Sequence, residues 1–382
     1  MRRGGKDGWE TRKLGEIADV QSGGTPLVHN KTYWNGDIAW YSSGELNDLH
    51  TSAPERHISR AGLENSNAKL FPAGSLLIGM YDTAALKMSV LDRPAAFNQA
   101  IAGVRPNDQI DLVFVLHAIN AIKDEILERR RGVRQKNLSL GKIKDIELLM
   151  PPLPEQRRIV GILDGAFEGI ATAKANAERN LQNARALFES HLNSVFTKRG
   201  PGWAEKTVDQ ISTNLDSRRV PITKGDRKSG KYPYYGASGI VDHVAEYIFE
   251  GDALLVSEDG ANLLMRSTPI AFSVSGKYWV NNHAHILKFA NMPTQRFVEF
   301  YLESIRLDEY IRGAAQPKLT QKALNAIPIP IPDSVEAQGE IVRRIEFLSA
   351  ETQRLSSIYQ QKLAALDELK KSLLHQAFSG EL

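Results

Sequence analysis

Two short stretches of the chain carry residues that could do metal or acid–base chemistry. His283-Ala284-His285 would place two imidazoles on one face of a strand, because side chains alternate along β structure. That spacing could bind a metal, but cysteine is absent and the sequence shows no third ligand nearby. Glu258-Asp259-Gly260 is a carboxylate pair typical of a turn before a hydrophobic run. We expect structural roles for both stretches and no metal site.

Catalytic motifs are missing from the sequence. It contains neither Gly-x-Gly-x-x-Gly nor the P-loop pattern, which argues against the common nucleotide-binding sites. It also lacks the Asn-Pro-Pro-Tyr tetrad expected of an adenine methyltransferase and any convincing Asp…Glu-x-Lys nuclease cluster. Without cysteine there can be no thiolate nucleophile, disulfide or Cys-based zinc site. We predict that the chain has no catalytic residues, is not an enzyme, and transfers no methyl group when purified alone.

Basic residues gather in three places, where they could meet nucleic acid. Phosphate contacts need Lys or Arg, and base edges are met by polar side chains on loops. The runs 129–136 and 312–318 share a Gly-x-x-Gln core, and the loop 218–231 leads into three tyrosines, a mixture that suits nucleic acid. The alternatives are a solvated charged surface and a loop beside a core strand. The DNA-binding candidates in these places are Arg129, Arg130, Arg134, Lys136, Arg218, Arg219, Lys224, Arg227, Lys228, Lys231, Tyr234 and Lys318.

The N-terminal part of the chain offers fewer candidates, all of them in predicted loops. The predicted DNA-binding residues there are Thr25, Lys31, Ser42, Ser43 and Lys87, with His29 and Tyr41 as further loop residues. The pairs Asn98-Gln99 and Asn281-Asn282 occupy equivalent places and could read adenine. Amides that stabilise a buried turn are an equally good interpretation of both pairs.

Composition limits the class of protein. The length of 382 residues predicts two or three domains, and the formal net charge of +3 permits nucleic-acid binding without arguing for it. There is no apolar run of about 18 residues, so no membrane span is expected. The basic N-terminus has no apolar stretch behind it and is not a signal peptide. A cytoplasmic protein fits these features.

The elements that must position these residues occur twice. Gly8-Trp9 and Gly202-Trp203 open two similar segments, and the helical tracts that follow superpose without a gap at an offset of 182. The first segment shows short apolar runs at Leu14–Val20, Ser75–Met80 and Ala100–Val104, which predict strands, and a helical spacing over Leu112–Leu127. Each segment is therefore predicted to be a mixed α and β domain, followed by one long helix.

The two helical tracts carry apolar seams with the 3.5-residue mean spacing of a coiled coil. The first seam runs from Ile159 to Leu187 and is rich in Ala, and the second runs from Ile341 through Leu369 to Leu373 with larger residues. Small residues facing large ones predict that the tracts pair, and chain order makes the pair antiparallel. The alternative is that each helix packs only on its own domain. Pairing places Trp9 near the far end of the second helix, close to Phe378.

Fragments of both halves resemble the specificity subunit of type I restriction-modification systems, over nearly the whole chain. Each fragment is weak alone, but their order and duplication make the resemblance strong. They are Gly8-Trp9-Glu10, Lys13-Leu14-Gly15-Glu16-Ile17, Gly24-Thr25-Pro26, Tyr33-Trp34, Ile38-Ala39-Trp40, Phe97-Asn98-Gln99, Pro151-Pro152-Leu153-Pro154-Glu155-Gln156, Tyr234-Tyr235-Gly236-Ala237-Ser238-Gly239-Ile240 and Ala377-Phe378-Ser379-Gly380-Glu381-Leu382.

The resemblance implies an α+β fold with two target-recognition domains separated by two long antiparallel helices, related by a pseudo-two-fold axis. It places recognition domains at 1–153 and 199–334 and spacer helices at 154–198 and 335–382. It implies that each domain reads one half of a bipartite, asymmetric DNA target. The partners it implies are double-stranded DNA, two modification subunits that carry S-adenosylmethionine, and restriction subunits; the chain itself needs no cofactor. A protein-binding adaptor with duplicated domains is the alternative.

A helix of this length spans about 65 Å at ~1.5 Å per residue, and B-DNA repeats every ~34 Å. The helices would then act as a ruler between the two half-sites. Inserting four residues near Asn180 should change the gap in the target and leave both half-sites intact. Methylome sequencing of cells carrying the variant measures this, and altered half-sites would argue against a ruler.

Overall fold

The computed structural model describes residues 8–128, 138–313 and 316–382. The chain divides into two compact units. The first comprises Met1–Ala177 with Lys362–Leu382, and the second comprises Glu178–Gln361. Each unit contains part of both long helices, whereas the predicted four segments keep each helix whole. The four-segment division stays a prediction. In the described part of the chain, no helix combines the length and the apolar character needed to cross a membrane.

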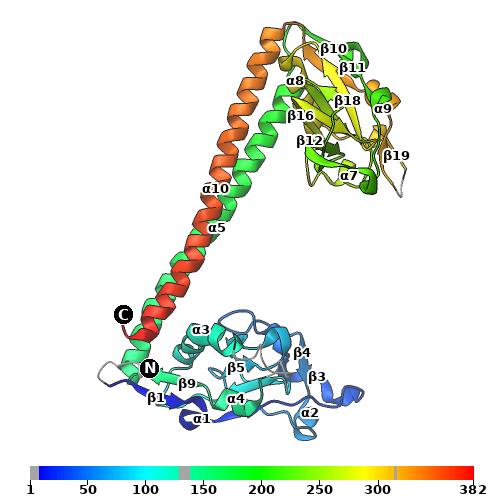
Figure 1. The fold of residues 1–382 in the computed structure, drawn as a ribbon. Helices are drawn as coiled ribbons and strands as arrows, with labels where there is room; N and C mark the ends of the chain where they lie inside the picture. The colour runs from blue at the N-terminus through cyan, green and yellow to red at the C-terminus, as the bar shows by residue number, and fades with distance from the viewer. Residues whose placement is uncertain (1–7, 129–137, 314–315) are drawn as a thin grey trace. The chain divides into compact units, whose positions relative to one another are not determined.

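The first unit is built on two small sheets (Figure 1). Four antiparallel strands follow the order β2-β8-β5-β6, and three follow the order β4-β3-β7, with β3 and β7 parallel. Their bounds are β2 Val20–Ser22, β3 Trp34–Tyr41, β4 Arg56–Ile58, β5 Leu76–Gly79, β6 Met88–Val90, β7 Ala95–Phe97 and β8 Ile101–Val104. Strand β5 is buried along its whole length, which explains its uninterrupted apolar sequence.

Short helices and a terminal ribbon complete this unit. β1 (Glu10–Lys13) pairs with β9 (Glu147–Met150), and α3 (Leu112–Glu128) contributes seven buried residues to the core. The shorter helices are α1 Leu14–Ile17, η1 Lys31–Tyr33, η2 Ser43–Glu45, α2 Arg60–Glu64, η3 Asp82–Ala84 and α4 Leu140–Lys144. The prediction of a strand over Leu14–Val20 is wrong at its start. There the Glu16 carboxylate accepts the Lys13 backbone N–H at 3.3 Å and caps a helical turn.

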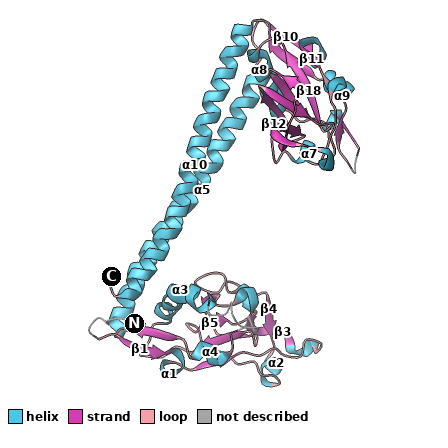
Figure 2. Cartoon of the chain, viewed as in Figure 1, coloured by secondary structure: helices cyan, strands magenta, loops and turns pink. Residues whose placement is uncertain are grey.

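The second unit repeats this plan. Its sheets have the orders β11-β18-β15-β16 and β13-β12-β17-β14, and β10 pairs with β21. The strands are β10 Trp203–Thr207, β11 Ser212–Asn214, β12 Ser229–Gly236, β13 Gly239–Val244, β14 Phe249–Glu250, β15 Ala253–Ser257, β16 Ala271–Val274, β17 Lys277–Val280, β18 Ala284–Phe289, β19 Ile311–Arg312, β20 Lys318–Leu319 and β21 Pro328–Pro332. The short helices are α6 Val208–Ile211, η4 Asp216–Arg218, η5 Lys224–Asp226, α7 Asn262–Met265, α8 Met292–Ser304, η6 Asp308–Tyr310 and α9 Gln321–Asn325. Both units contain helices as well as strands (Figure 2).

Backbone hydrogen bonds fix the correspondence between the two units. The Met80 N–H donates to the Ala100 carbonyl at 2.9 Å, and the Glu258 N–H donates to the His283 carbonyl at the same distance. The carbonyls of Met80 and Glu258 each accept an N–H at 2.8 Å, from Leu138 and Leu319 respectively. The sheet registers then make His285 the counterpart of Ala102, since these residues pair with Val256 and Ile78. One backbone frame therefore carries a different interior chemistry in each unit.

The long helices are α5 (Leu153–Thr197) and α10 (Val335–Ser379), and they pair in both units. In the first unit, the start of α5 packs on the end of α10 through a cluster that includes Ile159, Leu163 and Phe378. In the second unit, Leu192 and Phe196 of α5 share a cluster with Val342 and Ile345 near the start of α10. In each unit the helices therefore run antiparallel, as predicted.

The first cluster also confirms the predicted neighbourhood of Trp9, which packs against the group containing Phe378. Lys174 of α5 adds an ion pair to Asp367 of α10 at 2.7 Å. The prediction of which residues form the apolar seams is partly wrong, because Leu187 is 72% exposed and Leu369 is 46% exposed. Phe188 packs against the second-unit core in place of Leu187, because a straight helix drifts relative to a strict 3.5-residue repeat.

Candidate nucleic-acid interface

The loop that follows β11 carries most of the DNA-binding cations predicted in the second unit. It leaves the sheet where the Leu215 N–H donates to the Ile286 carbonyl at 2.9 Å. Three side chains then hold its backbone. The Trp279 indole N–H donates to the Val220 carbonyl at 2.6 Å, the Tyr234 hydroxyl accepts the Ile222 N–H at 3.1 Å, and the Arg227 guanidinium donates to the Ile222 carbonyl at 3.2 Å. The loop is thus fixed although it has little regular structure.

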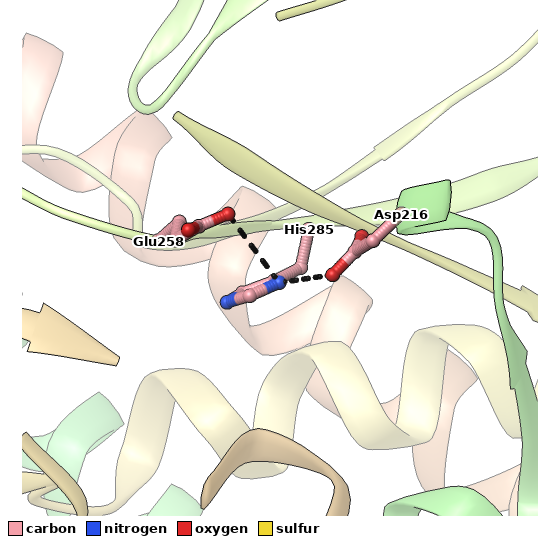
Figure 3. Close-up of side chains that lie close together, drawn as sticks. All are labelled: Asp216, Glu258 and His285. Atoms are coloured by element: carbon pink, nitrogen blue, oxygen red, sulfur yellow. Dashed lines mark hydrogen bonds and ion pairs between the residues drawn. The ribbon is translucent and has the colours of Figure 1, made fainter. Parts of the chain in front are cut away.

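A buried group of charges holds the base of the same loop (Figure 3). The carboxylates of Asp216 and Glu258 both approach Nδ1 of His285, at 2.5 and 3.8 Å. The other ring nitrogen, Nε2, lies 2.7 Å from the carbonyl oxygen of Leu319. Both ring nitrogens of His285 therefore face oxygen atoms.

Two further cations complete this group, which we call the ion cluster: Asp216, Arg219, Glu258, His285 and Lys318. Arg219 donates to the Glu258 carboxylate at 2.6 Å and to the Ala284 carbonyl at 2.9 Å. Lys318 reaches the same carboxylate at 3.0 Å. The cluster therefore ties the loop after β11 to β15, β18 and β20.

Electrostatics in the ion cluster favour the ionised carboxylates. Burial alone would raise the pKa of Asp216, but the hydrogen bond from His285 and the neighbouring positive charges outweigh it and leave that pKa lowered. Burial likewise opposes ionisation of Glu258, yet the hydrogen bonds from Arg219 and Lys318 lower its pKa. Each carboxylate is compensated by cations, as buried charges require.

The same three residues are the group that could hold a metal ion, since Asp216, Glu258 and His285 place ligand atoms within 4.8 Å of one another. The expectation that His285 has no further ligands nearby is therefore wrong. The chemistry nevertheless favours an ion pair, because Arg219 and Lys318 already neutralise Glu258 and both ring nitrogens of His285 are engaged. His283 lies apart from the cluster and pairs with Asp259 at 2.9 Å. A metal-free chain stays our prediction.

Two predicted DNA contacts in the second unit need correction. Tyr234 is 1% exposed, and its hydroxyl bonds the Ile222 backbone, so the ring belongs to the core. The Arg219 side chain is 13% exposed and is occupied by Glu258, because an unpaired Glu258 would be costly to bury. Both residues hold the loop and neither is free to face DNA.

The other second-unit candidates lie at or near the surface. Arg227 pairs with Asp242 at 3.2 Å and lies 4.4 Å from the centre of the Tyr234 ring, so it also supports the loop. Lys318 is half exposed while it binds Glu258. Exposed positions are held by Arg218, Lys224, Lys228 and Lys231. Arg218, Lys224 and Lys228 lie on the loop, and Lys231 lies just beyond it on β12.

The first-unit candidates that the structure describes include two cations, and most of these candidates are already engaged in contacts. Thr25 donates its hydroxyl to the Gln99 amide oxygen at 2.5 Å, and Lys87 binds the Asn47 side chain at 2.9 Å. Lys31 is exposed, whereas Ser42 and Ser43 are half-buried at a short helical turn. Arg129, Arg130, Arg134 and Lys136 lie outside the described residues.

For three polar residues the sequence did not decide between DNA contact and a structural role, and the structure gives all three a structural role. Tyr41 is buried and donates its hydroxyl to the Ser52 carbonyl at 2.7 Å. The amide oxygens of Asn98 and Asn281 each accept a backbone N–H two residues ahead, at 3.1 and 2.8 Å. These asparagines therefore stabilise equivalent turns, as the alternative interpretation proposed.

Sequence reasoning missed the tryptophans that hold the loops. Trp34 donates its indole N–H to the Leu27 carbonyl at 3.2 Å, and Trp40 donates to the Gly24 carbonyl at 3.0 Å. Together with Trp279 these residues fix one loop in each unit. Aligning the two halves of the sequence at the Trp9/Trp203 offset would have matched the two loops with each other. No sequence signal shows which carbonyl an indole N–H contacts.

Comparison with known proteins identifies the family. The family model for the type I restriction modification DNA specificity domain matches residues 6–179 and 201–363. The chain belongs to this family. The duplication seen in the sequence and in the backbone hydrogen bonds is thus two copies of one specificity domain.

Several curated relatives are similar to this specificity chain over most of its length. The EcoDI specificity subunit of Escherichia coli is 44% identical over 424 residues, covering 98% of this chain and 88% of the relative. The MjaIX specificity subunit of Methanocaldococcus jannaschii is 21% identical, with 98% and 93% covered. A putative specificity subunit of Haemophilus influenzae is 34% identical, and that match spans about half of each chain, 50% and 52%.

Solved structures support the fold. The HsdS subunit from Thermoanaerobacter tengcongensis has a TM-score of 0.68 at 16% identity, covering 100% of both chains. A chain from a study of complex assembly in the type I R-M system has a TM-score of 0.79 at 15% identity, covering 99% of both. The predicted resemblance and mixed α and β fold are confirmed. The relatives are named specificity subunits, so this chain is a DNA sequence-recognition subunit and not the catalytic one.

The ion cluster makes a prediction about acid stability of the second unit. Carboxylates whose pKa is lowered by folding stabilise the protein above their unfolded pKa of about 4, and this stabilisation is lost as the pH falls through the lower, folded pKa. Asp216→Asn should cost about 3 kcal/mol at pH 7, because it removes the carboxylate that lies 2.5 Å from the buried His285 ring. It should also flatten the loss of stability in acid.

Hydrogen exchange followed peptide by peptide measures this, with first-unit peptides as an internal reference. Asp333→Asn is the matched control, because its carboxylate is 62% exposed, and we expect a change within about 0.5 kcal/mol. Equal effects of the two substitutions would contradict the assignment.

Proposed function

We propose that this specificity subunit reads a bipartite, asymmetric DNA target, one half-site with each unit. The observation that carries the proposal is the fixed loop of the second unit, which exposes Arg218, Lys224 and Lys228 and leads into the exposed Lys231 of β12. In the described part of the chain, no ion-pair partner is found for Lys224 or Lys228. Free cations on an ordered loop suit the phosphate backbone, which supplies most of the affinity for DNA.

The two units differ in ways that favour unlike half-sites. Among the candidates that the structure describes, the first unit exposes one cation, Lys31, and the second exposes four. The interior under the loops differs as well, since Met80 and Ala102 stand where Glu258 and His285 stand in the second unit. Different side chains on one frame would present different surfaces to DNA. An asymmetric target is the simplest consequence.

The long helices supply a docking surface for partner subunits in this proposal. Phe347 is 65% exposed and Ile358 is 44% exposed on α10, and residues eleven apart share one helix face. Leu187 of α5 is 72% exposed in the same unit. These exposed apolar residues are suited to a stable interface.

The partners we propose for this surface are two modification subunits, which would carry S-adenosylmethionine, together with restriction subunits that join the assembly. One similar chain comes from a study of how a type I R-M complex assembles. The chain itself would need no cofactor and would act in the cytoplasm, where its DNA target lies. A protein-binding adaptor is the competing function, and salt-dependent binding to duplex DNA separates the two.

Removing cations from the loop should weaken DNA binding in a salt-dependent way. For the chain assembled with its modification subunits, Lys224→Ala combined with Lys228→Ala should reduce the slope of log affinity against log salt by about 2, one phosphate contact per lysine. Arg306→Ala is the control, because Arg306 is 85% exposed in the same unit and pairs with Asp308. An unchanged slope in the double variant would remove this loop from the interface.

Placing charge on the exposed apolar face of α10 should block assembly. Phe347→Glu and Ile358→Glu should each abolish co-purification with the modification subunit, because a buried unpaired carboxylate is costly at an interface. Gln360→Glu adds the same charge at an exposed position on this helix and should assemble normally. Full assembly of both apolar variants would place docking elsewhere.

A further inference from the structure

Each unit exposes large apolar side chains on a loop that follows the first strand of its four-stranded sheet. In the first unit, Leu27 is 67% exposed and Val28 57% exposed on the loop after β2. In the second unit, Val220 is 52% exposed on the loop after β11. The two loops are counterparts, because the strands before them pair in the same way. Val20 of β2 pairs with Val104 of β8, and at the equivalent position Asn214 of β11 pairs with Leu287 of β18.

Both loops are held by an indole at the exposed apolar residue itself. The N–H of Trp279 donates to the Val220 carbonyl at 2.6 Å, and the N–H of Trp34 donates to the Leu27 carbonyl at 3.2 Å. The two tryptophans lie on strands that do not correspond. Trp34 opens β3, while Trp279 lies in β17, whose counterpart is β7. The same kind of hydrogen bond, from an indole N–H to a loop carbonyl, is thus made in both units from positions that do not correspond.

Further contacts fix the rest of each loop. In the first unit the Gly24 N–H donates to the Phe97 carbonyl at 2.9 Å, and a Cβ at Gly24 would lie only 2.3 Å from the backbone of Asn67. This close approach explains the glycine. In the second unit the ion cluster holds the loop at Asp216 and Arg219. Because both loops are already held in place, each would lose little conformational entropy on binding a ligand.

Fixed and exposed apolar groups suit a ligand that is apolar at one point and charged around it. The thymine methyl group in the major groove of DNA is such a point, and apolar side chains read it by contact. The exposed cations Arg218, Lys224 and Lys228 lie on the same loop as Val220 and suit the phosphates that flank the groove.

We propose that Val220 in the second unit, and Leu27 with Val28 in the first, are specificity-determining residues that each contact a thymine methyl group in the half-site read by their unit. Trp279 and Trp34 are positioning residues, because they act only through the carbonyls that they hold. This inference rests on the proposed DNA-reading function and adds the residues and the base chemistry to it.

The experiment uses the chain assembled with its modification subunits and the target found by methylome sequencing. Each thymine of the two half-sites is replaced in turn by uracil, which lacks the methyl group. We expect one thymine in each half-site at which this replacement weakens binding about fourfold, the value of one buried methyl-sized group. Val220→Ser should abolish that sensitivity in one half-site only, and Leu27→Ser combined with Val28→Ser should abolish it in the other.

Controls separate reading from folding. Val241→Ser removes a valine that is 55% exposed on β13 of the same unit and should leave both half-sites unchanged. Trp279→Phe keeps an aromatic ring but loses the N–H, so it should weaken discrimination only at the thymine that Val220 contacts. Hydrogen exchange of each variant should match that of the wild type outside the loop.

Uracil sensitivity that survives Val220→Ser and the Leu27/Val28 variant would overturn the inference, as would its absence in the wild type. In either case sequence-specific binding would persist, and the proposed function would stand. Loss of sequence-specific binding by the wild-type assembly would instead overturn the proposed function.

Discussion

A buried carboxylate needs a positive charge beside it, and the second unit is organised by that requirement. Glu258 meets Arg219 at 2.6 Å and Lys318 at 3.0 Å, while Asp216 meets His285 at 2.5 Å. These partners come from separate stretches of the chain, so satisfying the charges brings the stretches together. The energy comes less from the attraction than from the cost of leaving any member unpaired. Exposed cations can then be presented to solvent from a fixed base.

The first unit obtains the same geometry with uncharged residues at the positions of Glu258 and His285. Met80 and Ala102 stand where Glu258 and His285 stand, inside an apolar core. Its loop is held by neutral hydrogen bonds from Trp34 and Trp40. Both loops are therefore held by a neutral indole bond, and the second-unit loop is held by the charged cluster as well. The frame persists because the sheet hydrogen bonds do not depend on side-chain identity.

Much of this architecture could be predicted from sequence, because it rests on periodicity and repetition. The strand around Leu77, the helix over Leu112–Glu128 and the antiparallel helix pair follow from apolar spacing alone. The candidate site was harder. Arg219 and Arg218 are neighbours with the same side chain, yet one is nearly buried by Glu258 and the other is exposed. Only tertiary contacts between distant residues distinguish them, and no local pattern carries that information.

The exposed tip of the second-unit loop is separated from its supports. Asp216 and Arg219 hold one side of the loop through ion pairs, and Trp279 and Tyr234 form hydrogen bonds with its backbone. None of these contacts depends on the side chain of Val220 or Lys224. Evolution can therefore exchange the tip residues while inheriting the supports unchanged. Grafting a tip between homologues would transfer a preference for bases only when the recipient keeps an equivalent set of supports. New lineages with new targets could arise by a few substitutions, with little loss of stability.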